Sequence, residues 1–441
     1  MADHHSRLHA AVAARNSTIQ HNSAQLSITQ RNTAQTIRRH LLALLLTCVC
    51  LARATDEVAA GAPLQPGAQR TVHQANTDAA LQPLYRSSLD PDLRPHQARL
   101  AANGPGPYPL HHLASTMAKL LPHKYYKHNT LVTIKGGRLH TAPFAPGITP
   151  SPTPRRLAAI VSALEELHTQ PGLALPDCVF ILNTWDEPRC PAASPEKCDA
   201  PVLSLIKTWD AKRRVSKHTD ILVPFFNHKY EEVVEYPWEQ KDPRALMRAA
   251  LQNGMRPNST RMWLLSLSQR PEAAQLLDVG ITNNLRKGLE VPIAPFMTLQ
   301  EHARYKYLIS ADGFTASCRF GKLLGVNSVI VKEDSPWVEY YYRALSPGQH
   351  YLTFTKDSAW QVVQALPHLV EAEMQAMALR AQQFQQTYLS THSKALYMRR
   401  VLLEYVQLFP VGAMAQFVTA LGNSTLASRQ LMQAKLAATK P

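Results

Sequence analysis

The stretch PDCVFILNTWDEP, residues 176–188, places an unbroken apolar run directly before a polar turn. Short apolar runs bounded by turn residues are typical of strands buried on both faces of a parallel sheet. VLSLI at residues 202–206 and SVIV at 328–331 are similar runs, and ILVPFF at 221–226 is a weaker one. We therefore expect a sheet-based core with buried parallel strands.

Helical periodicity lies between and after these runs. RRLAAIVSALEELH at residues 155–168 has apolar side chains at helical spacing, and residues 366–409 continue such spacing over one or two amphipathic helices. Residues 261–268 fit a strand or a helix. Strands that alternate with helices predict an α/β fold with mainly parallel sheets. Ligands of such folds bind beyond the carboxyl ends of the strands, so the chemistry is expected directly after each apolar run.

Composition indicates a globular chain with an anionic partner. The chain is 45% hydrophobic and 18% charged, which is usual for a globular protein. Its length of 441 residues predicts two or three domains. The formal net charge of +15 suits nucleic acid, an anionic nucleotide-sugar or a negatively charged membrane surface. Because no zinc-finger spacing, RNP aromatic pattern or basic heptad helix is present, we do not expect a nucleic-acid partner.

The first 54 residues are typical of a leader. A basic group at residues 38–40 precedes a short apolar run at 41–51, and Ala52-Arg53-Ala54 fits a cleavage site. We expect a signal peptide or a short signal-anchor over residues 1–54, with organelle import as the alternative. The expected location is the secretory lumen, in the endoplasmic reticulum or Golgi, or outside the cell, with membrane contact only through an uncleaved leader. Sequons at Asn258 and Asn423 agree with this route.

Residues 55–107 are rich in Ala, Gln, Pro and Gly and are expected to form a stem or linker, with ordered structure from about Tyr108. Of the cysteines outside the leader, Cys190 and Cys198 flank a Pro-rich loop and are the expected disulfide, with free buried thiols as the alternative. The absence of a CxxC pair argues against a structural zinc site.

Two polar segments follow the first apolar runs. Asp186, after CVFIL, has the position of a general base for an acceptor hydroxyl, although Asp close to Pro is also ordinary turn chemistry. The basic segment KRRVSKH, residues 212–218, either contacts an anionic partner or is a solvated loop.

A second cluster, DGFTASCR at residues 312–319, has features of a phosphate site. Gly313 permits a tight turn, Ser317 is a candidate helix cap, and Arg319 is a candidate phosphate ligand. Arg248 is a candidate second cation, although a lone arginine is usually a surface ion. WVEYYY at residues 337–342 suits either sugar contacts or a packed core edge.

Together these segments resemble glycosyltransferase family 90, which includes the Rumi-type protein O-glucosyltransferases and fungal capsule-associated xylosyltransferases. The matching stretches are PDCVFILNTWDEP, PVLSLIKTWD with DILVP, WEQKDPRALMRAA, ARYKYLISADGFTASCRFGKLL and NSVIVKEDSPWVEYYYRALSPGQHYL. They run from Pro176 to about Leu352, followed by a compatible helical tail.

The resemblance implies a GT-B arrangement, in which two Rossmann-like domains face each other across a cleft and C-terminal helices follow. It implies an acceptor domain over residues 108–240, a nucleotide-sugar domain with its helical tail over 241–410, and an extension over 411–441. Asp186 falls on the catalytic base and Arg248 on a donor-binding arginine. The segment that wraps the donor nucleotide corresponds to Phe314, Thr315, Ala316, Ser317, Cys318 and Arg319.

The function implied by the resemblance is inverting transfer of glucose or xylose from a UDP-sugar to a hydroxyl of a protein or glycan. The UDP-sugar is a co-substrate, no other cofactor is expected, and the family does not depend on a metal triad. One departure is Ala249, where the family has a glycine. It motivates the alternative of a catalytically silent glycan- or protein-binding module of the same fold.

Overall fold

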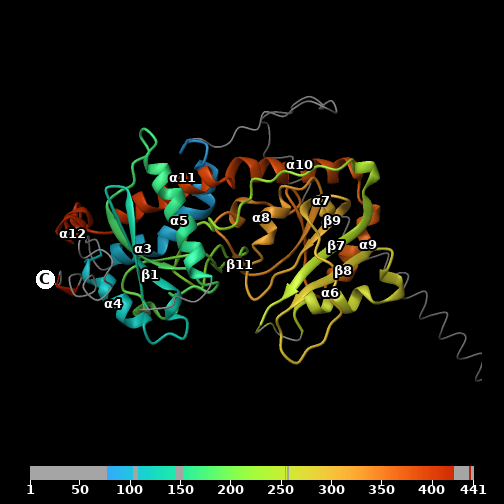
Figure 1. The fold of residues 1–441 in the computed structure, drawn as a ribbon, viewed down its shortest axis with the longest axis horizontal. Coiled ribbons are helices and arrows are strands. Elements are labelled where there is room, and N and C mark those ends of the chain that lie inside the picture. The colour runs from blue at the N-terminus through green and yellow to red at the C-terminus, as the bar shows by residue number, and fades with distance from the viewer. Residues whose placement is uncertain are drawn as a thin grey trace, which may run out of the picture. The chain divides into compact units, whose positions relative to one another are not determined.

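The computed structural model describes residues 77–102, 108–144, 152–253, 255, 258–421 and 437–438. Within these ranges the chain forms two five-stranded sheets and a two-stranded ladder, with helices packed around them (Figure 1). The expected leader, residues 1–54, lies outside the described ranges. Among the described helices, none has the length and apolar character needed to cross a bilayer.

The first sheet has the strand order β2-β1-β3-β4-β6 and is mixed. Its strands are β1 (Asn129–Lys135), β2 (Arg138–Pro143), β3 (Cys178–Asn183), β4 (Val202–Ser204) and β6 (Ile221–Leu222). Every residue of β3 is buried, as its apolar run predicts. β3, β4 and β6 are parallel, whereas β1 pairs antiparallel with both β2 and β3. The expected parallel arrangement is therefore confirmed for three of the five strands.

The second sheet has the order β12-β10-β9-β7-β8 and is parallel throughout. Its strands are β7 (Asp242–Leu251), β8 (Leu277–Asn284), β9 (Tyr305–Ser310), β10 (Val329–Glu333) and β12 (Leu352–Phe354). The carboxyl ends of all five strands consequently lie along one edge of this sheet. A short ladder of β5 (Lys207–Thr208) and β11 (Trp337–Val338) pairs segments that belong to the two halves of the sequence.

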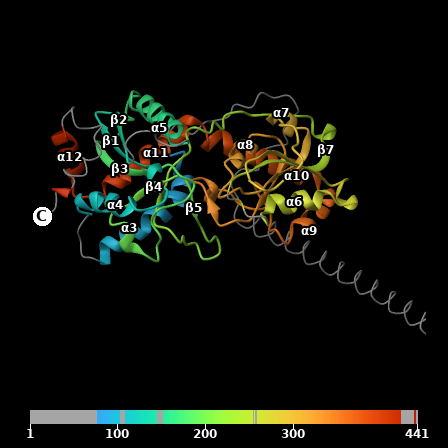
Figure 2. The same ribbon diagram turned by 60° about the horizontal axis from the view of Figure 1, so that its bottom comes forward.

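Helices cover both sheets, and the last two return to the first sheet. The longer ones are α4 (His111–Leu120), α5 (Thr153–His168), α6 (Thr260–Ser268), α10 (Glu371–Tyr388), α11 (Thr391–Val406) and α12 (Ala413–Leu421). α10 packs on β10, whereas α11 lies beside α5 and α12 packs on β1 and β3 (Figures 1 and 2). The sequence predicts a helical tail of the second domain up to residue 410, but α11 packs against α5 of the first half of the chain. α12, in the segment expected as a C-terminal extension, also packs on the first sheet.

The beginning of the fold also differs from the sequence reading. Residues expected in a stem form α2 (Gln82–Leu84), a π-helical turn (Tyr85–Leu89) and α3 (Asp90–Ala102). Asp92 on α3 is fully buried and pairs with Lys207 at 2.5 Å and with Arg343 at 2.6 Å. A buried carboxylate needs such partners, so α3 is an integral part of the core and the stem prediction is wrong for residues 82–102.

The described cysteines separate into one disulfide and two free thiols. Cys190 and Cys198 are joined, which confirms the expected pair. Cys178 is a buried thiol of β3, and Cys318 is partly exposed. The basic segment after β5 is an exposed hairpin that closes through backbone hydrogen bonds between Asp210 and Val215, which agrees with the solvated-loop reading.

Candidate active site

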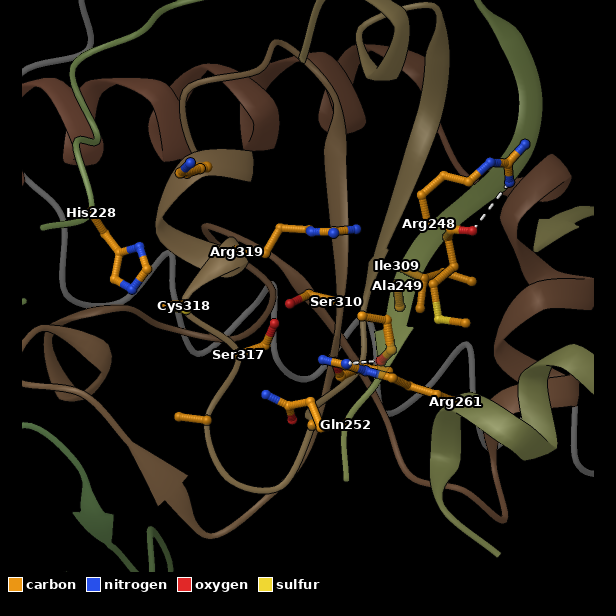
Figure 3. A pocket seen from close by; sticks show the side chains of 16 residues that line it. His228, Arg248, Ala249, Gln252, Arg261, Ile309, Ser310, Ser317, Cys318 and Arg319 are labelled. Atoms are coloured by element: carbon orange, nitrogen blue, oxygen red, sulfur yellow. Dashed lines mark hydrogen bonds between the residues drawn. The ribbon is translucent and has the colours of Figure 1, made fainter. Parts of the chain in front are cut away.

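A pocket of about 830 Å³, including the space at its open mouth, lies at the carboxyl ends of β7 and β9. The two strands are neighbours and parallel, so the rule for ligand sites in α/β folds predicts this position. The residues that line it are His228, Met247, Arg248, Ala249, Ala250, Gln252, Arg261, Ile309, Ser310, Ala311, Gly313, Ala316, Ser317, Cys318, Arg319 and Lys322 (Figure 3).

The charged side chains that line the pocket are all cations. Arg248, Arg261, Arg319 and Lys322 contribute to it, and no aspartate or glutamate does. Arg319 and Lys322 come from the short helix α8 (Arg319–Leu323), and neither has a carboxylate within ion-pair distance among the described residues. Burial lowers the pKa of Arg319, which means that its charge costs free energy until an anion compensates it. The pocket is therefore suited to an anionic ligand.

The other two arginines are already held by protein groups. Arg248 pairs with Asp278 at 2.8 Å, and its side chain is only 12% exposed. Tyr305 donates to the same carboxylate at 2.6 Å. Arg261 donates to the main-chain carbonyls of Ala250 and Ala311, which lie at the ends of β7 and β9. Arg248 thus lines the pocket as half of an ion pair, whereas Arg261 links the two strand ends.

The loop between β9 and α8 packs against the residue that follows β7. Gly313 lies so close to Gln252 that an added Cβ would come within 2.2 Å of its Oε1, and the amide of Phe314 donates to that oxygen at 2.8 Å. A side chain at position 313 would therefore have to displace the end of the Gln252 side chain. Ser317 does not cap α8 as we expected, because Cys318 occupies the N-cap position and no side-chain cap bond forms. Its amide instead donates to Asp312 at 3.1 Å.

Of the six residues predicted in this segment, four line the pocket. They are Ala316, Ser317, Cys318 and Arg319. The backbone amide of Phe314 donates to the side chain of Gln252, and Thr315 is buried. Neither of these two side chains lines the pocket.

Asp186 lies in the turn after β3 and does not line the pocket. Its Oδ1 accepts a hydrogen bond from Nη2 of Arg156 at 2.8 Å, and its side chain is 26% exposed. The charge of Asp186 nevertheless acts on one pocket residue, Cys318. Burial raises the pKa of the Cys318 thiol to about 12, and the nearby charges of Glu339 and Asp186 add to that effect.

Aromatic rings surround the turn that carries Asp186. The indole of Trp185 stacks on Tyr125 and on His128, with ring centroids 4.9 and 4.2 Å apart. Nδ1 of His128 lies 2.9 Å from the hydroxyl of Thr153. Burial, together with Arg189 and Arg156, lowers the pKa of His128 to about 4, so this imidazole is neutral at physiological pH. The carboxylate therefore stands beside a partly exposed aromatic wall.

The aromatic segment at residues 337–342 belongs to the core. Glu339, Tyr340 and Tyr341 have no solvent exposure. Burial raises the pKa of Glu339 to about 8, and its Oε2 has no hydrogen-bond partner among the described residues. The structure favours the packed-core interpretation of this segment over sugar contacts.

Sequence reasoning missed five of the pocket's polar residues: His228, Gln252, Arg261, Ser310 and Lys322. His228 could have been found, because only Asn227 separates it from the ILVPFF run and it thus lies where strand-end ligands are expected. Gln252 and Arg261 carry no local signal, since their roles depend on where β7 ends. Within the described ranges, no three His, Cys, Asp or Glu side chains converge as metal ligands.

Comparison with known proteins adds a family match to this geometry. The sequence profile described as glycosyl transferase family 90 matches residues 118–416, which include both sheets and the pocket. Protein O-glucosyltransferase 1 of Rattus norvegicus is 28% identical over 263 residues, covering 52% of this chain and 62% of that protein. O-glucosyltransferase rumi of Drosophila pseudoobscura pseudoobscura is 27% identical over 266 residues, or 53% and 61% of the two chains.

A further relative, protein O-glucosyltransferase 3 of Homo sapiens, is 30% identical over 175 residues, covering 38% of this chain and 33% of that protein. The chain thus spans about three fifths of the length of the first two relatives and a third of this one. The shared region contains the fold, whereas a common substrate does not follow from it.

Proposed function

The chain belongs to glycosyl transferase family 90, as its sequence resemblance predicts, and from that premise we propose that it transfers glucose or xylose from a UDP-sugar to a hydroxyl of a protein or glycan acceptor. In this proposal the transfer inverts the configuration of the sugar. The two sheets correspond to the two Rossmann-like domains of a GT-B arrangement, of which the first carries the acceptor and the second the nucleotide.

The observation that carries the proposal is the charge of the pocket. Four cationic side chains and no carboxylate line a cavity at the strand ends, where α/β enzymes bind nucleotides. A departing UDP develops negative charge on its diphosphate, and fixed cations stabilise that charge in the transition state. Arg319, which lacks a counter-ion among the described residues, is the proposed diphosphate ligand. We place Arg248 and the segment Phe314–Arg319 around the same nucleotide.

Asp186 is the proposed catalytic base. Inverting transfer needs one base that removes the proton of the acceptor hydroxyl on the side opposite the leaving nucleotide. Asp186 extends from the first sheet, outside the cationic pocket, and the aromatic wall beside it suits an acceptor. No metal is part of this proposal, and the UDP-sugar is its only co-substrate.

A catalytically silent binding module is the second candidate. Ala249 stands where the family has glycine, lines the pocket and is 6% exposed. It also belongs to the buried apolar cluster of the second sheet, so the extra methyl group lies at the wall of the pocket. Such a module would bind UDP or a glycan without transferring sugar.

We propose the secretory lumen as the location, in the endoplasmic reticulum or Golgi, or secretion from the cell. The Cys190–Cys198 disulfide is typical of an oxidising compartment. Asn258 of the first sequon is exposed, and Asn423 of the second lies outside the described ranges. In this proposal, any contact with the membrane is made through an uncleaved leader.

The test measures UDP release and donor binding with the purified full-length chain. UDP-glucose, UDP-xylose and UDP-galactose are supplied separately, with and without a candidate acceptor protein. We expect release of UDP from the glucose or xylose donor, and UDP binding that is roughly tenfold or more weaker in Arg319→Ala. Arg270→Ala, which removes an exposed arginine outside the pocket, is the matched control. Binding without release would favour the silent module, and neither binding nor release would refute both.

A further inference from the structure

One pocket residue comes from outside the second sheet and its loops. His228 follows β6 of the first sheet, whereas the other lining residues all lie between Met247 and Lys322. Figure 3 shows its imidazole across the pocket from Arg248 and Arg261, near the loop that carries Ser317 and Cys318. The pocket is thus completed by the part of the chain that also carries Asp186.

A buried lysine holds the loop that presents this imidazole. Lys394 on α11 is fully buried, and its Nζ donates to the main-chain carbonyls of Phe225 at 3.1 Å and His228 at 2.7 Å. The imidazole packs edge-on against the ring of Phe225, with centroids 5.3 Å apart, and stacks on Tyr230 at 6.3 Å. These contacts fix both the backbone and the ring, so the imidazole enters the pocket in a defined orientation.

The neighbours of the ring determine which nitrogen carries the proton. Nδ2 of Asn227 lies 3.4 Å from Nε2 of His228. With the Asn227 amide in this orientation its nitrogen donates, so Nε2 accepts and the proton of the neutral imidazole is on Nδ1. Burial, followed by the charges of Arg156 and Lys322, lowers the pKa of His228 to about 4, which keeps the ring neutral at physiological pH. Nδ1–H has no hydrogen-bond partner among the described residues and is available to a ligand.

The position of His228 indicates which part of a donor it would meet. This step rests on the proposed function, in which the anomeric carbon lies between the diphosphate and the acceptor hydroxyl. Arg319 lies on the side of the second sheet, and Asp186 extends from the first sheet. The sugar ring must therefore occupy the part of the pocket nearest the first sheet, from which His228 projects. We propose that Nδ1–H of His228 donates a hydrogen bond to an oxygen of the transferred sugar, so that His228 is a sugar-binding residue of the donor site.

The experiment compares binding of UDP with binding of UDP-sugars. UDP, UDP-glucose and UDP-xylose are titrated by calorimetry into the full-length wild type, His228→Ala and His228→Asn, and UDP release is measured for each donor. The asparagine variant is included because its amide nitrogen takes roughly the place of Nδ1. His368→Ala, which removes an exposed histidine far along the chain from the pocket residues, is the control.

We expect the alanine variant to bind UDP within about twofold of the wild type, because the nucleotide is held by the second sheet. Its affinity for the preferred UDP-sugar should fall roughly five- to tenfold, which corresponds to the loss of one hydrogen bond. The asparagine variant should retain most of the wild-type affinity. The thermal unfolding midpoint of each variant shows whether removal of the ring loosens the loop. If it does so in the alanine variant, the asparagine variant decides the result.

Two results overturn the inference while the proposed function stands. Equal loss of affinity for UDP and for UDP-sugars would mean that His228 contacts the nucleotide. Unchanged affinity for all three ligands would mean that it contacts none of them. A wild-type chain that binds no UDP-sugar would reject the proposed function and this inference together.

Discussion

Nη2 of Arg156 lies 2.8 Å from Oδ1 of Asp186 and anchors the turn after β3. Nη1 of the same guanidinium donates to the carbonyl of Thr184, and the group lies 4.8 Å from the ring centroid of Phe225. The arginine side chain is 9% exposed, against 26% for the aspartate. Oδ2 of Asp186 has no hydrogen-bond partner among the described residues. A buried cation thus orients one carboxylate oxygen and leaves the other available to a substrate.

Replacement of Asp186 by Asn should abolish most of the transfer without loss of donor binding. The amide cannot accept the acceptor proton, so turnover should fall by roughly 10²–10⁴. The affinity for UDP should stay unchanged, because Asp186 does not line the cationic pocket. Initial rates and calorimetry measure the two effects separately. Glu187→Gln, at the neighbouring and equally half-buried position, is the matched control. Near wild-type turnover in Asp186→Asn would exclude Asp186 as the base.

Replacement of Arg156 by Lys should act through Asp186. A lysine keeps the charge but cannot contact Thr184 and Asp186 at once, so the carboxylate loses its fixed orientation. We expect kcat to fall roughly ten- to hundredfold, with an unchanged KM for the donor. In the Asp186→Asn background the same replacement should lower kcat little further, because the two residues act together. Losses that multiply in the double variant would show that Arg156 supports the fold and does not position the base.

Several buried strands follow from local sequence, whereas β7 and β9, whose ends hold the pocket, were not predicted as strands. CVFIL and SVIV are unbroken apolar runs, and they form strands β3 and β10. The strand predictions succeed because burial on both faces of a strand leaves a direct mark on composition. The rule of strand-end chemistry led to the turn of Asp186, and it would have led to His228 as well if it had been applied to ILVPFF.

Other parts of the fold depend on contacts between distant residues. β1 is almost wholly buried, yet it contains Thr130 and Thr133, so no apolar run marks it. α3 contains Pro95 and its buried residues include Asp92, whose partners lie more than a hundred residues away. The close approach of Gly313 to Gln252 likewise joins the ends of two strands. Pairings of this kind leave no periodic signal in either segment.

Restoration of the family glycine at position 249 tests whether the extra methyl group blocks the donor. Ala249 lines a pocket with a volume of about 830 Å³ including its mouth, and it belongs to the buried apolar cluster of the second sheet. We therefore expect Ala249→Gly to change the affinity for UDP by less than about threefold, well under the tenfold that 1.4 kcal/mol would produce. Calorimetry with UDP measures this directly. A gain of UDP binding or turnover only in the glycine variant would instead support the silent module.

Replacement of Glu339 by Gln should remove a pH dependence of stability. Burial, opposed in part by the charge of Lys394, raises the pKa of Glu339 to about 8 from its ordinary value of 4.5. Between these pH values the folded chain holds a proton that the unfolded chain has lost. The free energy of unfolding should therefore decrease as the pH rises through this window, by up to ~1.4 kcal/mol per pH unit from this group. Glutamine is neutral at every pH in this window, so the variant lacks this pH dependence of the free energy of unfolding.

The measurement is the free energy of unfolding by denaturant at several pH values between 5 and 8, for the wild type and Glu339→Gln. The stability of the variant relative to the wild type should increase steadily with pH, because only the wild type must keep a buried carboxyl protonated. Glu373→Gln, on the exposed face of α10, should run parallel to the wild type. A difference between Glu339→Gln and the wild type that is constant with pH would mean that Glu339 is ionised in the folded chain. The carboxylate of Asp186 would then face a second negative charge across the same core, which its pairing with Arg156 would have to offset.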